Sequence, residues 1–254
     1  MQRIVYGSVV VLLSGITGNA LAQEPTPVDW SGFYVGGLLG AAKGKSETHT
    51  HAGADVIYFL PDETVQLSEA GSNELEQWQP AGGLLGGYGK QFGNLYVGVE
   101  VSVSSLFLDD QHSVTETYVS TPGTNLTLKQ SVSAEWIATL RPRLGWAQDN
   151  WLVYVTGGLA VTQLRLDTKF TDDAWSAYSR STTKETVTGV SLGLGGEYAL
   201  GPNWAIKGEY LYTKFDEVES SSYLSTTNAG GGRLHHSADL DTQGLFIGAT
   251  YRFH

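Results

Sequence analysis

The segment WIATLRPRLGWA, residues 136–147, places two arginines two positions apart inside an otherwise apolar run. Side chains of an extended strand point alternately to opposite faces. One face then holds Trp136, Ala138, Leu140, Pro142, Leu144 and Trp146, and the other holds Glu135, Ile137, Thr139, Arg141, Arg143 and Gly145. The alternation predicts a strand with one apolar face and one charged face.

The same alternation recurs along the chain in segments of about ten residues or more. In residues 94–108 the residues Leu95, Val97, Val99, Val101 and Val103 share one face, opposite Glu100, Ser102 and Ser104. Eight such segments are predicted as strands, at residues 32–45, 76–91, 94–108, 130–146, 151–168, 185–200, 203–215 and 239–253. In the first of them the pattern does not decide which face points outward.

The connections between these segments alternate strictly in length. Three are tight turns, at Gly93-Asn94, Gln148-Asp149-Asn150 and Gly201-Pro202-Asn203. The other four, at residues 46–75, 109–129, 169–184 and 216–238, are long and polar. Turns at one rim and long loops at the other are typical of an all-β, eight-stranded antiparallel up-and-down transmembrane β-barrel with long outer loops and short periplasmic turns.

A soluble barrel or β-sandwich is the alternative, and the two differ in where the charges lie. A soluble fold turns its charges to water, whereas a membrane barrel turns its apolar rows to lipid and closes the sheet so that every backbone group is paired. Aromatic residues near many strand ends suit the two interfacial girdles of a membrane barrel. These include Trp30, Phe33, Trp78, Tyr88, Phe92, Trp136, Trp146, Trp151, Tyr198, Trp204, Tyr210 and Phe253. The sequence therefore favours the membrane barrel.

The first 22 residues read as a cleaved signal peptide. Arg3 is followed by an apolar run from Ile4 to Leu13 and by Ala20-Leu21-Ala22, a small-residue cleavage pattern. A membrane anchor is the alternative, but the apolar run is shorter than the roughly 20 residues that span a bilayer as a helix. We expect a short periplasmic leader at residues 23–31 and one barrel domain at residues 32–254, located in the bacterial cell outer membrane.

Composition excludes some classes of partner and of stabilisation. Without Arg3 the chain has 14 basic and 26 acidic residues, a formal charge of −12, which argues against nucleic acid as a partner. With no cysteine there can be no disulfide framework. An eight-stranded barrel must therefore draw its stability from its sheet and its interior.

The interior of an eight-stranded barrel is only just wide enough for side chains to fill. Nine charged residues are predicted to face it: Glu100, Glu135, Arg141, Arg143, Arg165, Glu197, Lys207, Glu209 and Arg252. Isolated buried charges cost several kcal/mol each, so these five cations and four anions are expected to pair in a network that plugs the lumen. A conducting path and a catalytic cluster are the alternatives.

Four runs resemble the small outer-membrane immunogenic proteins of the porin-opacity superfamily: WSGFYVGGLLG (30–40), WIATLRPRLGWAQDNWLVYVTGGLA (136–160), GGEYALGPNWAIKGEYLYTKFDEV (195–218) and GLFIGATYRFH (244–254). The resemblance covers all eight strands and implies an eight-stranded surface barrel. Two residues depart from it. Pro142 cannot donate a backbone hydrogen bond to the ladder, and His254 follows the terminal aromatic residue Phe253.

Three functions are open: a structural or surface-interaction protein, a weak porin, or a haemin receptor, the last because some members of the resembling family bind haemin. The haem candidates are His49, His51, His112, His235 and His236, all in predicted outer loops, where a solvated surface role is the alternative. We predict no catalytic residue, no metal site, no bound cofactor and no enzyme activity. The fold and the resemblance imply outer-membrane lipid, lipopolysaccharide and the barrel assembly machinery as partners, with haemin as a further candidate.

Overall fold

The computed structural model describes residues 28–56, 58–174, 176–226 and 231–254. The predicted signal peptide, residues 1–22, and the first part of the predicted leader lie outside the described residues. Within the described ranges no helix is long and apolar enough to cross a membrane.

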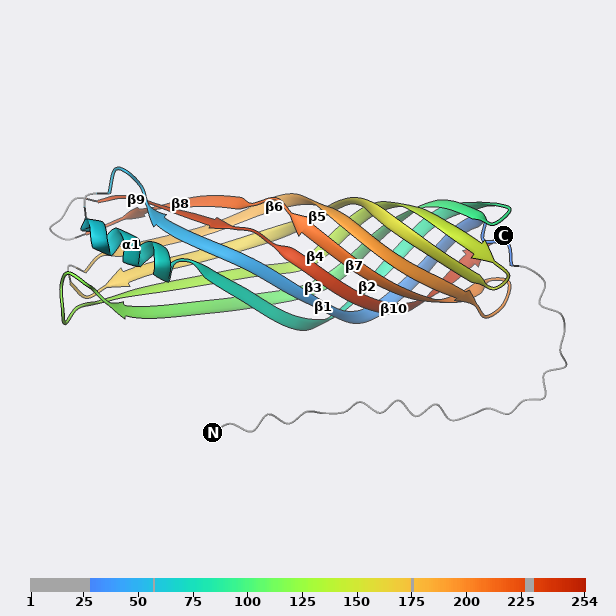
Figure 1. Ribbon diagram of the computed structural model, residues 1–254, viewed down its shortest axis with the longest axis horizontal. Coiled ribbons are helices and arrows are strands. Elements are labelled where there is room, and N and C mark those ends of the chain that lie inside the picture. Colours follow the sequence, from blue (N-terminus) through green and yellow to red (C-terminus); the bar gives the residue numbers. More distant parts are fainter. Residues whose placement is uncertain (1–27, 57, 175, 227–230) are drawn as a thin grey trace, which may run out of the picture.

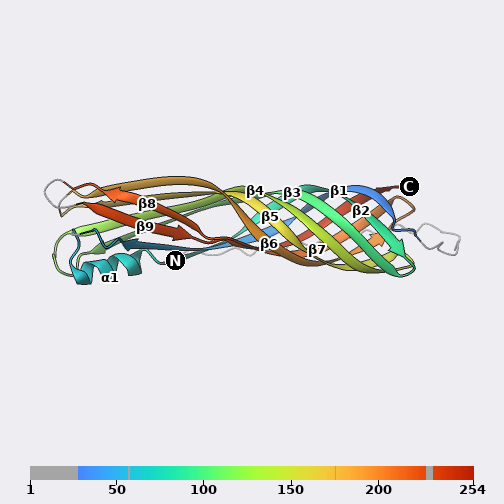
Figure 2. The same cartoon turned by 90° about the horizontal axis from the view of Figure 1, so that it is seen from above.

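The chain forms one long antiparallel tube of β-strands with a single described helix against one end (Figures 1 and 2). Its elements are β1 (Gly32–Ala52), α1 (Pro61–Ala70), β2 (Asn73–Phe92), β3 (Leu95–Thr117), β4 (Asn125–Gln148), β5 (Trp151–Asp172), β6 (Tyr178–Ala199), β7 (Trp204–Phe215), β8 (Val218–Leu224), β9 (Gly232–Ala238) and β10 (Asp241–Phe253). Strands β1 to β7 and β10 form a ring of eight, because β10 pairs with both β7 and β1. The predicted eight-stranded barrel is confirmed.

The apolar rows point outward, as the alternation predicts. Val97, Val99, Val101 and Val103 on β3 are each 43–51% exposed, whereas Tyr96 and Glu100 between them are buried. On β1, where the sequence left the face open, Phe33, Val35 and Leu39 face out and Tyr34 and Leu38 face in. The outer wall of the ring is therefore a continuous apolar surface, which suits lipid and not water.

The predicted tight turns lie together at the end of the tube near the C-terminus (Figure 1). Gly93 and Asp149 adopt positive φ values of 62° and 52° at two of them, as short hairpin turns require. At the opposite end three of the four long connections are mostly strand, and the first contains α1. β1, β3, β4, β5 and β6 each run 20 residues or more, and β8 with β9 forms a hairpin that continues the wall above β7 and β10.

These extensions were predicted as loops because their exposed residues are polar, yet their alternate residues enclose an apolar core. This core contains Phe59, Leu67, Tyr118, Leu126, Leu128, Phe170, Leu224 and Leu234. A strand whose polar residues face water and whose apolar residues face inward is typical of a sheet that encloses a hydrophobic core. The tube therefore continues beyond the lipid-facing belt as a packed extension.

Helix α1 covers an opening in the wall of this extension. Strands β2 and β3 pair only as far as Gly82 and Ser105, and beyond that point each pairs with its other neighbour alone. Leu67 of α1 is fully buried beneath the helix, and the Gln66 amide donates to the carbonyl of Thr117 at 2.8 Å. The helix thus replaces the missing sheet contact.

Candidate functional site

Seven charged side chains meet inside the ring and are named here the lumen cluster. They are Glu100 on β3, Arg141 and Arg143 on β4, Glu197 on β6, Lys207 and Glu209 on β7, and Arg252 on β10. None is more than 4% exposed. The sheet register sets the pairs, since Glu100 lies opposite Arg141 and Glu197 lies opposite Lys207 on neighbouring strands.

Glu100 is the centre of the cluster. Its carboxylate accepts hydrogen bonds from Arg141 Nη2 and Lys207 Nζ at 2.8 Å and from Arg143 Nη1 at 3.1 Å. The Tyr34 hydroxyl donates to the same carboxylate at 3.1 Å. One anion on β3 therefore contacts cations from the neighbouring strand β4 and from β7 on the opposite side of the ring.

The other two carboxylates extend the cluster in both directions. Glu209 lies 3.2 Å from both Arg141 and Lys207. Glu197 accepts from Arg143 Nη2 at 2.5 Å and lies 3.8 Å from Arg252. Every cluster charge thus has an oppositely charged neighbour, which offsets the cost of removing it from water.

Aromatic rings close the cluster on the side of the tight turns. The Arg143 guanidinium lies 3.6 Å from the ring centroid of Tyr154, a favourable cation–π distance. Arg252 lies 5.4 Å from the ring of Trp30 and donates to the Trp30 carbonyl. Trp30 is 1% exposed and packs with Leu152 and Tyr96. The sequence analysis assigned Trp30 to the leader and to an interfacial aromatic girdle. The girdle assignment is wrong, because Trp30 is buried inside the barrel at the end with the tight turns.

The structure does not bring two of the nine predicted lumen charges into the cluster. Glu135 is exposed because β4 has a bulge there, with two residues opposite a single residue of β5 between Ala134 and Ile137. A bulge shifts the alternation by one residue, so Glu135 and Trp136 both face out. The strict alternation used in the prediction was wrong at this point.

Arg165 is also on the outer surface, where it pairs with Asp167 at 2.6 Å. It shares its parity with Val153 and Val155, which are more than half exposed. Outward-facing and inward-facing residues alternate along β5 as far as Arg165 without a bulge. The outward position of Arg165 could therefore have been predicted from the sequence. The corrected lumen cluster has four cations and three anions. Within it, the Nε atoms of Arg141 and Arg143 are buried and have no hydrogen-bond acceptor.

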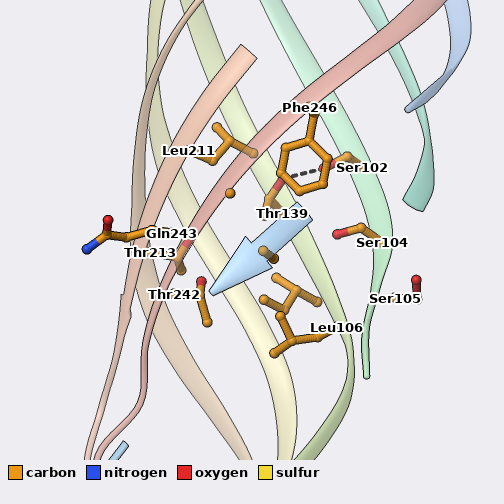
Figure 3. A pocket seen from close by; sticks show the side chains of 13 residues that line it. Ser102, Ser104, Ser105, Leu106, Thr139, Leu211, Thr213, Thr242, Gln243 and Phe246 are labelled. Carbon is orange, nitrogen blue, oxygen red and sulfur yellow. Dashed lines mark hydrogen bonds between the residues drawn. The ribbon is translucent and has the colours of Figure 1, made fainter. Parts of the chain in front are cut away.

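A small cavity of about 30 Å³ is shown in Figure 3. It lies beside the cluster on the side of the extension, because its lining residues Ser102 and Thr139 form the next inward-facing pair after Glu100 and Arg141. Ser102 and Thr139 line it and share a hydrogen bond of 2.7 Å, and Phe246, Leu211 and Leu106 pack around it. This volume holds on the order of two water molecules. Further along, Val132, Leu164, Leu166 and Phe215 are buried in the interior and form an apolar layer.

Pro142 interrupts the ladder on one side only. It pairs in register with Val99 of β3, but the pairing of β4 with β5 omits Arg141 and Pro142. The Thr156 hydroxyl instead donates to the Pro142 carbonyl at 2.8 Å. The pairing that this proline puts in doubt is kept toward β3 and absent toward β5.

All five candidate histidines lie in the extension. His51, His235 and His236 line one pocket there, whereas His49 and His112 are not among its lining residues. The rings of His51 and His235 stack on the outer surface with centroids 5.4 Å apart. His49 contacts the Ser72 hydroxyl at 3.2 Å, and His112 is half-buried on β3. In the part of the chain that the structure describes, no group of three or more His, Asp or Glu residues is placed to hold a metal ion. Haemin binding stays a prediction.

His236 points into the extension and is 2% exposed. Its Nδ1 lies 2.9 Å from the Thr50 hydroxyl and its Nε2 lies 2.8 Å from the Ser222 hydroxyl. Both ring nitrogens of His236 therefore have hydrogen-bond partners within the protein. Burial lowers the pKa of His236 from 6.5 to about 4, with smaller contributions from His235 and His51.

Acid should therefore weaken the extension. Below pH 6.5 the unfolded chain binds a proton at His236 that the folded chain does not bind until about pH 4. The free energy of unfolding should then fall across this window, by about 3 kcal/mol from this group. Urea unfolding between pH 7 and pH 4 should show this loss in the wild type and a flatter profile in His236→Gln. His49→Gln, which changes an exposed ring, is the control, and an equal slope in all three proteins would contradict the assignment.

The closed ring, its apolar outer wall and its charged interior define an outer-membrane β-barrel. Residues 8–253 match the family described as outer membrane protein beta-barrel domain, and the chain belongs to this family. It is 32% identical over 224 residues to the 31 kDa outer-membrane immunogenic proteins of Brucella melitensis biotype 1 and Brucella suis biovar 1, over 84% of this chain and 87% of theirs. The outer membrane protein OprG of Pseudomonas aeruginosa has the same fold, with a TM-score of 0.51 at 15% identity, over 90% of this chain and 98% of that one.

Proposed function

We propose that this outer-membrane barrel is a non-conducting surface protein, with a lumen closed by paired charges and an extension that serves as a rigid platform for surface interactions. The observation that carries the proposal is the lumen cluster, in which all seven charges are buried and each lies near an opposite charge. An aqueous pore would instead leave charges of this kind hydrated along a continuous path.

The extension supports the second half of the proposal. Its apolar core, the hydrogen bonds of α1 and the long continuous strands fix its outer residues in place. A preformed surface loses little conformational entropy when it binds a partner. Mobile loops of the same length would have to be ordered first.

Conductance in a planar lipid bilayer tests the closed lumen. The refolded wild-type protein should give no steady current, and Arg143→Ala should also remain silent, because the apolar layer around Leu164 and Leu166 lies further along the same lumen. A wide-bore porin inserted in the same apparatus is the positive control. Regular open-channel steps from the wild-type protein would contradict the proposal and favour a porin.

A further inference from the structure

Three cations lie directly opposite one another on the outer face of the extension. Lys129 of β4 pairs in register with Lys169 of β5, and Lys169 pairs in turn with Arg180 of β6. All three residues are exposed. Neighbouring strands lie about 4.8 Å apart, so the three residues form a row about 10 Å long. Like charges at directly opposite positions destabilise a sheet, so the row has a cost that the fold itself does not explain.

A second pair of cations enlarges this row. Arg165 of β5 and Lys184 of β6 lie opposite each other, four residues nearer the lipid-facing belt, a distance of about 13 Å along the strand. Four of the 14 basic residues after Arg3 belong to the lumen cluster, and half of the remaining ten lie on these three strands. We name these five residues the basic face: Lys129, Arg165, Lys169, Arg180 and Lys184.

Carboxylates leave most of the basic face without a partner. Asp167 lies between the two rows and pairs with Arg165 at 2.6 Å. In the part of the chain that the structure describes, no carboxylate forms an ion pair with the other four residues of the basic face. A chain with a formal charge of −12 thus concentrates exposed positive charge on one side of its extension. Local charge of one sign attracts partners of the opposite sign.

We propose that the basic face binds a sulfated linear polysaccharide outside the membrane, with sulfate groups contacting the row of Lys129, Lys169 and Arg180. A sulfate ester is permanently ionised, and its oxygens accept charge-assisted hydrogen bonds from lysine and arginine. Closely spaced sulfates along one chain match cations that follow one another from strand to strand. This names the class of partner for the proposed surface platform, and it rests on that proposed function.

The height of the basic face argues against a lipid headgroup as the partner. Val161 is the last apolar residue in the outward-facing row of β5, and Lys169 lies eight residues further along the strand. Eight residues span about 26 Å, which a strand tilt of 45° reduces to about 18 Å above the belt. The headgroup region on one side of a bilayer is only about 5–8 Å thick. The partner therefore comes from outside the membrane.

Nucleic acid is another long polyanion, and the surroundings of the row favour a sugar chain over it. Single strands bind where successive bases stack on several aromatic side chains along a basic groove. Among the described residues of β4, β5 and β6 in the extension, Tyr178 is the one exposed aromatic side chain. Its ring centroid lies 5.8 Å from Lys169 Nζ. One tyrosine beside the row offers an apolar face to a sugar ring but no platform for a series of bases.

Binding of heparin, a heavily sulfated linear polysaccharide, tests the proposal. The refolded protein is placed in nanodiscs of zwitterionic phospholipid, so that no lipopolysaccharide competes, and titrated by isothermal calorimetry. Lys129→Gln combined with Lys169→Gln should weaken binding about tenfold, because two exposed charge contacts are lost. The affinity of the wild type should fall as salt is added, and the fall should be shallower in the double variant.

Lys43→Gln combined with Lys45→Gln is the matched control. It removes the same charge from β1, where Lys43 pairs with Glu76 and Lys45 with Glu47, and it should bind heparin like the wild type. Chemically desulfated heparin should bind the wild type no better than heparin binds the Lys129 and Lys169 double variant. Equal affinity of the two double variants, or of the two forms of heparin, would overturn the proposal. Tighter binding of single-stranded DNA would also overturn it and make nucleic acid the partner.

The stability of the double variant shows whether lost binding is lost folding. Removing two of three opposed like charges relieves repulsion between neighbouring strands. The urea midpoint of Lys129→Gln with Lys169→Gln should therefore equal or exceed that of the wild type. A lower midpoint would contradict the unpartnered row on which the proposal is built.

Trypsin separates this inference from the proposed platform. It cleaves after lysine and arginine, so it probes β4, β5 and β6 at the basic face itself. A protein that resists trypsin but does not bind heparin would overturn this inference alone. Rapid cleavage at Lys129, Lys169 or Arg180 would instead contradict the rigid extension of the proposed function.

Discussion

Replacing Glu100 by glutamine should destabilise the barrel by about 3–5 kcal/mol, the usual cost of removing one partner from a buried ion pair. Glutamine has nearly the same shape but carries no charge. The cluster would then contain four cations and two anions, and Arg141, Arg143 and Lys207 would lose the carboxylate that all three contact. Urea unfolding in lipid vesicles, followed by tryptophan fluorescence, measures the loss.

Two further variants make this result specific. Glu135→Gln changes the same residue type on the same barrel, but at an exposed position, so it should change the free energy of unfolding by no more than about 0.5 kcal/mol. Lys207→Met in the Glu100→Gln background restores an excess of one positive charge, as in the wild type, and should recover part of the loss. A Glu100→Gln protein as stable as Glu135→Gln would show that the lumen cluster does not stabilise the barrel.

Arginine at Val101 should cost about 2–4 kcal/mol, as expected for a charge on the lipid face near the bilayer midplane. Val101 is 51% exposed on β3 and lies opposite Leu140 of β4. Leu140 itself lies between Trp136 and Trp146, the two interfacial tryptophans of that strand. Arginine here can reach neither water nor a carboxylate without distorting the bilayer.

Val119 supplies the matched comparison, because it is 64% exposed in the connection between β3 and β4. Val119→Arg should unfold within about 0.5 kcal/mol of the wild type. The unfolding free energies in vesicles should therefore separate the two arginine variants. Equal stability of both would mean that Val101 does not face lipid.

The ring of eight strands could be predicted from the sequence because two independent signals agreed. Alternation on β3, β7 and β10 set the faces, and the strict sequence of short and long connections set the topology. The ends of β1 to β6 that lie in the extension could not be predicted from polarity. In the extension the outer residues are polar and the inner residues, such as Leu126 and Leu128, are apolar, which reverses the pattern of the lipid-facing belt.

The charged site was predictable only where alternation continued unbroken. Arg141 and Arg143 lie on the C-terminal side of the β4 bulge, so their face could be assigned directly from Leu140 and Leu144. Glu135 lies at the bulge itself. The residue types around it give no sign in the sequence that the strand contains an extra residue. The roles of Trp30 and Tyr154, which enclose the arginines, required the three-dimensional packing, because a buried aromatic and an interfacial aromatic look alike in sequence.

Chemical accessibility of single cysteines on β3 tests the central claim most directly, and the chain has no native cysteine to interfere. In lipid vesicles, Val101→Cys and Val103→Cys carrying a fluorophore should be quenched by lipid-soluble and not by water-soluble quenchers. Ser102→Cys, next to the lumen cluster, should resist a water-soluble maleimide until the protein is unfolded. Rapid aqueous labelling at position 102, or at positions 101 and 103, would contradict a barrel with an apolar exterior and a closed, ion-paired interior.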